Sequence, residues 1–172
     1  METVITKAQI DDLEAILALQ YAVYQSEAEI LGDYSIQPLR QTLGELVEEY
    51  KKSVVLKAAL GNEIIGSVRA YAKGGTVYIG KLMVRPDHQG AGLGTRLLAE
   101  IEKRFDCDRF ELFTSCKSER NLHLYKKSGY IRFREETDGS GVKFAYLEKN
   151  IDLSPTARPL AAPRRLSSVH IK

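Results

Sequence analysis

The chain has 172 residues, the size of one ordinary domain and enough to bury a single hydrophobic core. Apolar residues make up 44% and charged residues 28% of the sequence, as in a typical globular protein. The net charge is +2, but residues 153–172 alone carry +4 and the rest carries −2, which argues against a nucleic-acid-binding body. Two cysteines are too few for a disulfide framework or a zinc cluster.

Residues 1–153 are expected to form one domain in the cytoplasm. The N-terminus has no apolar signal core, and no apolar run reaches the length that spans a membrane. Residues 154–172 are rich in proline and basic residues and show no apolar periodicity. They are therefore expected to form a separate C-terminal tail.

Hydrophobic periodicity divides the body into alternating strands and helices. The prediction in chain order is a strand at 3–7, helices at 9–30 and 38–51, strands at 53–60, 63–73 and 76–84, a helix at 92–105, a strand at 109–116, a helix at 119–127 and strands at 130–136 and 142–149. This order, β-α-α-β-β-β-α-β-α-β-β, predicts an α/β fold with a mixed sheet of about seven strands and helices on both faces.

A glycine-rich loop between a predicted strand and a predicted helix is the most informative stretch. Residues 89–95 read Gln-Gly-Ala-Gly-Leu-Gly-Thr and carry almost no side-chain bulk where the helix is expected to begin. The free N–H groups and dipole of a helix N-terminus attract anions, and a backbone without Cβ atoms can approach a phosphate closely. The loop matches neither the Walker motif nor the Gly-x-Gly-x-x-Gly dinucleotide fingerprint, so it predicts a phosphate-bearing ligand of another kind.

The loop resembles the Gln/Arg-x-x-Gly-x-Gly/Ala signature of the GNAT superfamily of acetyl-CoA-dependent N-acetyltransferases. Gln89, Gly92 and Gly94 occupy its fixed positions, and Leu82 and Val84 match the Leu-x-Val that ends the preceding strand of the family. The predicted order of elements also matches the family over the whole body, and the resemblance implies a mostly antiparallel sheet. The alternative at this loop is a turn that binds nothing.

The resemblance implies acetyl-CoA as the cosubstrate, with its pyrophosphate on the loop. The residues expected to bind it there are Gln89, Gly90, Ala91, Gly92, Leu93, Gly94 and Thr95. The main chain of Leu82, Met83 and Val84 would pair with the pantetheine amides like an added strand, in a cleft where strands 76–84 and 109–116 splay apart. A main-chain N–H near Val84 would polarise the thioester carbonyl, as in an oxyanion hole.

A second stretch, residues 121–130, resembles the helix of the family that ends Leu-Tyr-x-x-x-Gly-Phe/Tyr. The family tyrosine falls on Tyr125, where it protonates the departing thiolate; a phenol suits this role because phenols and thiols have comparable pKa values, roughly 10 and 8.5. Asn121, one turn earlier on the same helical face, is expected to contact the pantetheine. Many relatives place this asparagine at the position of Ser118, so the choice between the two stays open. The alternative for Tyr125 is a half-buried core residue.

The general base is not evident from the sequence. Relatives often carry a glutamate in the strand before the loop, where this chain has Gly80 or Lys81. The remaining candidates are a water chain or one of the side chains of Glu27, Glu29, Asp33, Tyr34, Tyr71 and Tyr78.

The sequence therefore predicts an N-acetyltransferase that moves an acetyl group from acetyl-CoA to a primary amine by direct transfer in a ternary complex. A small amine is the first expectation and a protein N-terminus or lysine the second; acidic residues near 27–33 and 45–49 favour a cationic acceptor. A non-catalytic acyl-CoA-binding regulator is the alternative from another class. No metal, nucleic acid or membrane partner is expected. The acceptor and the oligomeric state stay open, with a homodimer among the alternatives.

Overall fold

The computed structural model describes residues 1–151, so the tail predicted at 154–172 lies outside the described residues. The elements are β1 (Val4–Lys7), η1 (Ile10–Asp12), α1 (Leu13–Leu31), α2 (Gln37–Arg40), α3 (Leu43–Tyr50), β2 (Val54–Leu60), β3 (Glu63–Lys73), β4 (Thr76–Val84), η2 (Pro86–His88), α4 (Leu93–Glu102), β5 (Arg109–Ser115), α5 (Glu119–Lys127), β6 (Ile131–Thr137) and β7 (Lys143–Asn150). They form one seven-stranded sheet in the order β1-β2-β3-β4-β5-β7-β6. Only β4 and β5 pair in parallel, which confirms the predicted mixed and mostly antiparallel sheet.

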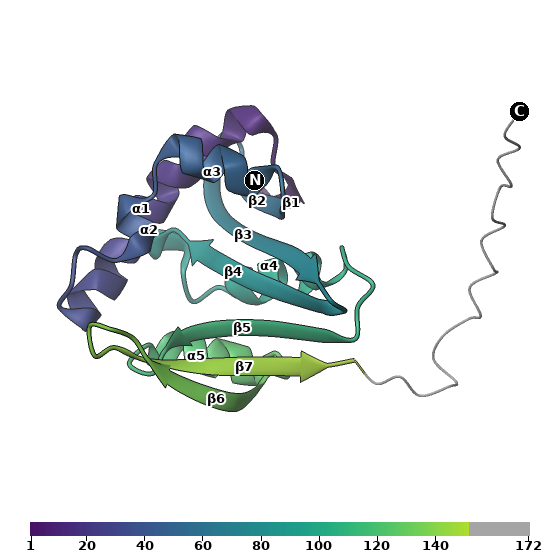
Figure 1. The fold of residues 1–172 in the computed structure, drawn as a ribbon. Helices are drawn as coiled ribbons and strands as arrows, with labels where there is room; N and C mark the ends of the chain where they lie inside the picture. Colours follow the sequence, from purple (N-terminus) through teal and green to yellow (C-terminus); the bar gives the residue numbers. More distant parts are fainter. Residues whose placement is uncertain (152–172) are drawn as a thin grey trace, which may run out of the picture.

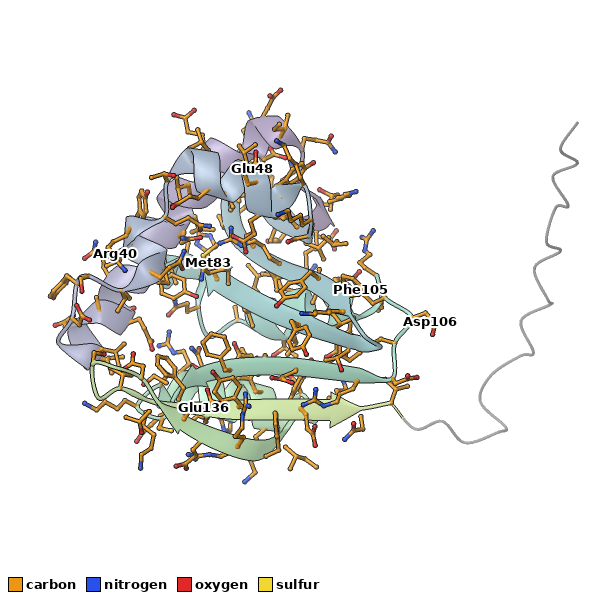
Figure 2. All side chains as sticks on the ribbon, viewed as in Figure 1. Arg40, Glu48, Met83, Phe105, Asp106 and Glu136 are labelled. Carbon is orange, nitrogen blue, oxygen red and sulfur yellow. The ribbon has the colours of Figure 1, made fainter. Side chains whose placement is uncertain are left out.

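Helices cover both faces of the sheet, as predicted. Figure 1 shows α1, α2 and α3 over one end of the sheet and α4 and α5 behind it. Leu13, Leu46 and Met83 belong to the core cluster under α1 and α3, and Figure 2 shows Met83 on β4 close to these helices. Leu97 and Tyr125 belong to the larger cluster under α4 and α5. Each fully buried large apolar side chain contributes roughly 1.5–3 kcal/mol, so the two clusters hold the sheet from opposite sides.

The single helix predicted at 38–51 is wrong, because the structure divides it into α2 and α3. The Thr42 hydroxyl accepts a hydrogen bond from the Glu45 N–H, and the Glu45 carboxylate accepts one from the Thr42 N–H. This capping box starts a new helix, because it satisfies two N–H groups that would otherwise have no partner. The break leaves Gln41 in an extended conformation, buried and in contact with α1.

The structure confirms that β4 and β5 splay apart. They are in register only at Thr76–Arg109, Val77–Phe110 and Tyr78–Glu111, and diverge beyond these pairs. On its other side β4 has a bulge against β3, where Lys81 has a φ of 50°. A bulge bends and twists its strand. The second half of β4 is therefore not paired with β5, which leaves a gap in the hydrogen bonding of the sheet between these strands.

Candidate functional site

The diverging part of β4 presents main-chain groups to this gap. The Arg85 N–H donates to the Ile65 carbonyl of β3 at 2.8 Å, so the N–H and C=O of Val84 point the other way, toward the gap. The Gln89 side chain donates to the Val84 carbonyl at 2.9 Å, which agrees with this direction. The conformation of the strand therefore directs the Val84 N–H, a hydrogen-bond donor, into the gap.

The glycine loop leads from β4 into α4 with an open surface. Gly92 is the N-cap of α4 and has a φ of 83°, a left-handed conformation that favours glycine. A Cβ atom at Gly90 or Gly92 would meet no other atom within 4 Å, so the loop leaves room for a ligand. Gly94 differs, because a Cβ there would lie 2.9 Å from Leu124 Cδ1. Its small size is required for packing between α4 and α5.

Tyr125 of α5 is part of the core cluster on the face that α4 and α5 cover. Its side chain is 7% exposed and its ring lies 6.1 Å from that of Tyr130, between centroids. The hydroxyl has no hydrogen-bond partner among residues 1–151 and is not one of their buried unsatisfied atoms, so it is not completely enclosed. Burial raises the pKa of Tyr125, and the nearby Tyr24 and Glu27 raise it further. The phenol therefore keeps its proton well above neutral pH.

The two candidates for a pantetheine contact have different partners. Asn121 donates to the Thr114 hydroxyl at 3.2 Å. Ser118 stands at the N-cap of α5, but its side chain makes no capping bond. Its hydroxyl instead donates to Glu27 of α1 at 2.6 Å. This bond links α1 to α5 and occupies Glu27, one of the candidate bases.

A cavity of about 130 Å³ lies on the opposite face, where β4 and β5 begin to diverge. Tyr71, Tyr78 and Phe113 supply its aromatic walls, and the Tyr71 and Tyr78 rings stack at 5.2 Å. Glu111 and Arg69 supply charged walls. The remaining lining residues are Glu49, Ser53, Ala70, Ile79, Gly80 and Leu112.

Glu111 is a carboxylate at the cavity that sequence reasoning missed. Its side chain is 13% exposed and lies 2.6 Å from the Arg109 guanidinium. In β5, Phe110 and Leu112 are buried in the core, so Glu111 between them must face the other side of the sheet. This alternation could have indicated that Glu111 faces the cavity, but only the fold brings it to the splay point.

The other candidate bases are placed differently by the structure. Tyr71 and Tyr78 line the cavity, whereas Asp33 accepts hydrogen bonds from Ser35 in the loop after α1 and Tyr34 is exposed. Glu29 is exposed on α1. The structure therefore does not bring Glu29, Asp33 and Tyr34 into the lining of the cavity.

Lys81 projects from the β4 bulge toward α1 and α2. Its ammonium donates to the Gln37 side chain at 3.1 Å and lies 5.8 Å from the centroid of the Tyr24 ring. Burial, together with the positive charge of Arg69, lowers the pKa of Lys81 to about 8. Lys81 and the buried Arg69 therefore place two positive charges on the side of the sheet where α1, α2 and α3 pack.

Comparison with protein families gives a match to the acetyltransferase (GNAT) family over residues 13–130. The chain belongs to this GNAT family. The match includes the splayed strands, the glycine loop and Tyr125. No curated protein sequence matches the chain.

Solved structures with the same fold include several acetyltransferases. PaiA N-acetyltransferase of Thermoplasma acidophilum, in complex with coenzyme A, has a TM-score of 0.74 and 20% identity over 88% of this chain and 100% of its own. The ribosomal-protein-S18-alanine N-acetyltransferase of Escherichia coli has a TM-score of 0.70 and 14% identity over 97% and 100%. The yncA protein of Salmonella typhimurium, with its cofactor acetyl-CoA, has a TM-score of 0.69 and 19% identity over 93% and 99%. At these identities the likeness shows the GNAT fold.

Within residues 1–151, no helix is both long enough and apolar enough to cross a membrane. The same part of the chain contains no group of three or more histidine, cysteine or acidic side chains arranged to hold a metal ion.

Proposed function

We propose that this GNAT protein transfers the acetyl group of acetyl-CoA to a primary amine of a small molecule, directly and in a ternary complex. The observation that carries this proposal is the divergence of β4 and β5 beside the open glycine loop. Tyr125 lies on α5, which packs against α4 at Gly94, and its hydroxyl has no hydrogen-bond partner among residues 1–151. The related structures with coenzyme A and acetyl-CoA support the choice of donor.

The donor side of the gap fits coenzyme A. The loop at residues 89–95 would hold the pyrophosphate, because Gly92 leaves its surface open at the N-terminus of α4. The main chain of Leu82, Met83 and Val84 would bind the pantetheine, with Asn121 as a side-chain contact. The Val84 N–H would stabilise negative charge on the thioester oxygen. The thioester itself supplies an activated acetyl group.

Tyr125 and Glu111 would handle the protons. The acceptor nitrogen bonds to the acetyl carbon as the carbon–sulfur bond breaks, and Tyr125 donates its proton to the departing sulfur. An amine with a pKa near 10 is neutral in only about one molecule per thousand at pH 7, so its proton must be accepted. Glu111 is the cavity carboxylate nearest the splay and would accept this proton, directly or through water. A proton from solvent then restores the phenol.

A small acceptor fits the cavity better than a folded protein does. The cavity of about 130 Å³ is walled by side chains of β3, β4 and β5 and by Glu49 of α3. Such a space admits a compact amine or the end of a flexible chain. A protein N-terminus or lysine therefore remains the second candidate for the acceptor.

The test is thiol release from acetyl-CoA in the presence of a panel of small amines. We expect release that depends on the amine and matches the amount of N-acetyl product found by mass spectrometry. Calorimetric binding of coenzyme A without thiol release from any amine or peptide would contradict catalysis and favour the regulator.

A further inference from the structure

Arg69 is the most deeply buried charged residue that lines the cavity. Its side chain is 2% exposed, and its Nη2 donates to the side-chain oxygens of Gln20 and Gln41. Its Nε and Nη1 atoms are buried without a hydrogen-bond partner. Nη1 lies 3.3 Å from a Glu49 oxygen, within ion-pair distance but out of hydrogen-bond alignment. Buried guanidinium donors without acceptors are costly, so this arrangement suits a site completed by a ligand.

The charged residues that line the cavity are one guanidinium, that of Arg69, and the carboxylates of Glu49 and Glu111. Arg69 and Lys81 lie close enough for the charge of Arg69 to lower the pKa of Lys81, and Glu49 acts in the opposite direction on both groups. Glu49 is 38% exposed and also accepts a hydrogen bond from Gln41 at 2.8 Å. Glu111, on the far wall, is held by Arg109 at 2.6 Å. Because Arg109 holds Glu111, Glu49 is the lining carboxylate whose charge acts on both Arg69 and Lys81.

Several of the acidic residues that favoured a cationic acceptor have partners within the fold. Glu45 caps α3, Glu48 pairs with Lys51 at 2.6 Å, and Glu27 accepts the Ser118 hydroxyl. Glu49 faces Arg69. Each of the two carboxylates that line the cavity, Glu49 and Glu111, therefore lies beside an arginine.

We propose that the acceptor is an amino-acid-like molecule that carries a carboxylate beside its primary amine. This inference rests on the proposed function. The carboxylate lies on Arg69, where it supplies the acceptor oxygens that the buried guanidinium lacks. The amine is directed to the gap between β4 and β5. The rings of Tyr71, Tyr78 and Phe113 pack against an apolar side chain of the acceptor, because Tyr71 and Phe113 are 47% and 56% exposed at the rim.

The first experiment measures binding by the full chain with coenzyme A present. The probes are N-acetyl-L-phenylalanine and N-acetyl-L-phenylalaninamide, which differ in the carboxylate and contain no titrating amine. We expect the acid to bind at least tenfold more tightly by calorimetry. Equal binding, tighter binding of the amide, or no binding of either compound at millimolar concentration would overturn the inference.

The second experiment asks whether Arg69 is responsible. Kinetic constants for L-phenylalanine and L-phenylalaninamide are compared in the parent and in Arg69→Met, which keeps an unbranched stem and removes the guanidinium. The amine pKa of each acceptor is the same with both proteins, so it cancels from the comparison. We expect the acid-to-amide ratio of kcat/KM to fall at least tenfold in the variant. An unchanged ratio in a folded variant would overturn the assignment.

Arg134→Met is the matched control. Arg134 lies over the Tyr146 ring at 4.2 Å on β6 and does not line the cavity, so its removal deletes a positive charge without touching Arg69. We expect its acid-to-amide ratio to equal that of the parent. If Arg69→Met fails to fold, the calorimetric comparison on the parent still decides whether the carboxylate is recognised. Absence of thiol release from every acceptor would contradict the proposed function, while that binding comparison would still decide this inference.

Discussion

The two sides of the gap between β4 and β5 are formed by different kinds of chemical group. On the proposed donor side the groups are main-chain atoms: the N-terminus of α4, the loop around Gly92 and the N–H of Val84. On the proposed acceptor side they are side chains from three strands and from α3, with Arg69 and Glu111 as the charged members. Tyr125 is the proposed catalytic side chain on the donor side.

This difference explains why the sequence contains a clear pattern for the proposed donor side and no local pattern for the proposed acceptor side. A ligand held by main-chain atoms requires glycines at set spacings, because backbone access and left-handed conformations exclude most side chains. Those glycines are contiguous and readable. A ligand held by side chains requires only that scattered residues meet, so its specificity leaves no local pattern. The following variants test whether the division holds.

Replacement of Tyr125 by phenylalanine should have the largest effect. The ring keeps its packing but loses the proton, so kcat should fall by roughly 10²–10⁴, the usual contribution of a positioned acid. The KM for acetyl-CoA should change little, because the loop is intact. Steady-state kinetics measure both constants. Because burial raises the pKa of Tyr125, the parent should lose its acid only well above pH 10.

The matched control for this change is Tyr130→Phe. Tyr130 is a neighbouring buried tyrosine whose hydroxyl donates to Glu102 at 2.8 Å, away from the gap. Its kcat should stay near that of the parent. If Tyr125→Phe kept more than half the parent kcat, the general acid would have to be water or another tyrosine.

Replacement of Glu111 by glutamine should lower kcat/KM for the acceptor by about 100-fold at pH 7, the lower end of the range for a positioned base. The loss should shrink as the pH rises, since the neutral fraction of an amine with a pKa near 10 grows about tenfold per pH unit. A pH profile of kcat/KM measures this. The control is Glu148→Gln, which removes the other carboxylate held by Arg109, at 2.5 Å, without lining the cavity. Equal losses in both variants would indicate a structural role through Arg109.

Replacement of Gly92 by valine should weaken coenzyme A binding by about tenfold or more, roughly 1.4 kcal/mol. The branched side chain would enter the space that the loop leaves open. Calorimetry with coenzyme A measures the change. Gly141→Val is the control for backbone strain, because Gly141 has a φ of 85° and open space around it in the β6–β7 turn. Unchanged affinity in folded Gly92→Val would place the phosphates elsewhere.

Replacement of Lys81 by methionine should have the smallest effect, a gain of about 1 kcal/mol in the free energy of unfolding at pH 7. The folded pKa of Lys81 is about 8 against 10.5 for the ordinary side chain, so the charged form is disfavoured in the native state. Below pH 8 both states are protonated and this cost is fully present. Between pH 8 and 10.5 the native state loses the proton first, so the parent recovers relative to the variant.

Urea unfolding of both proteins at several pH values measures this difference. The gain of Lys81→Met should be largest at pH 7 and should decline toward pH 10. A gain that is independent of pH would show that the methionine acts through packing and that the charge of Lys81 is not costly.

Much of the fold and the donor side could be predicted from local sequence. The run from Thr76 to Thr95 combines an apolar strand, a stop at Pro86 and a glycine loop before a helical period, and each signal acts over a few residues. The structure places β3, β4 and α5 at the predicted bounds for this reason. The helix prediction at 38–51 failed because apolar spacing continues through Thr42, while the capping box of Thr42 and Glu45 starts a new helix.

The residues of the proposed acceptor side come together only in the tertiary structure. The chain by itself determined where strands, helices and the glycine loop form, because neighbouring residues control backbone conformation and face. The meeting of Arg69 with Gln20 and Glu49, and of Ser118 with Glu27, depends on packing between elements up to 91 residues apart. Such contacts involve single residues with no shared spacing. The arrangement of charges around the cavity, on which the proposed acceptor depends, is therefore formed only when the chain folds.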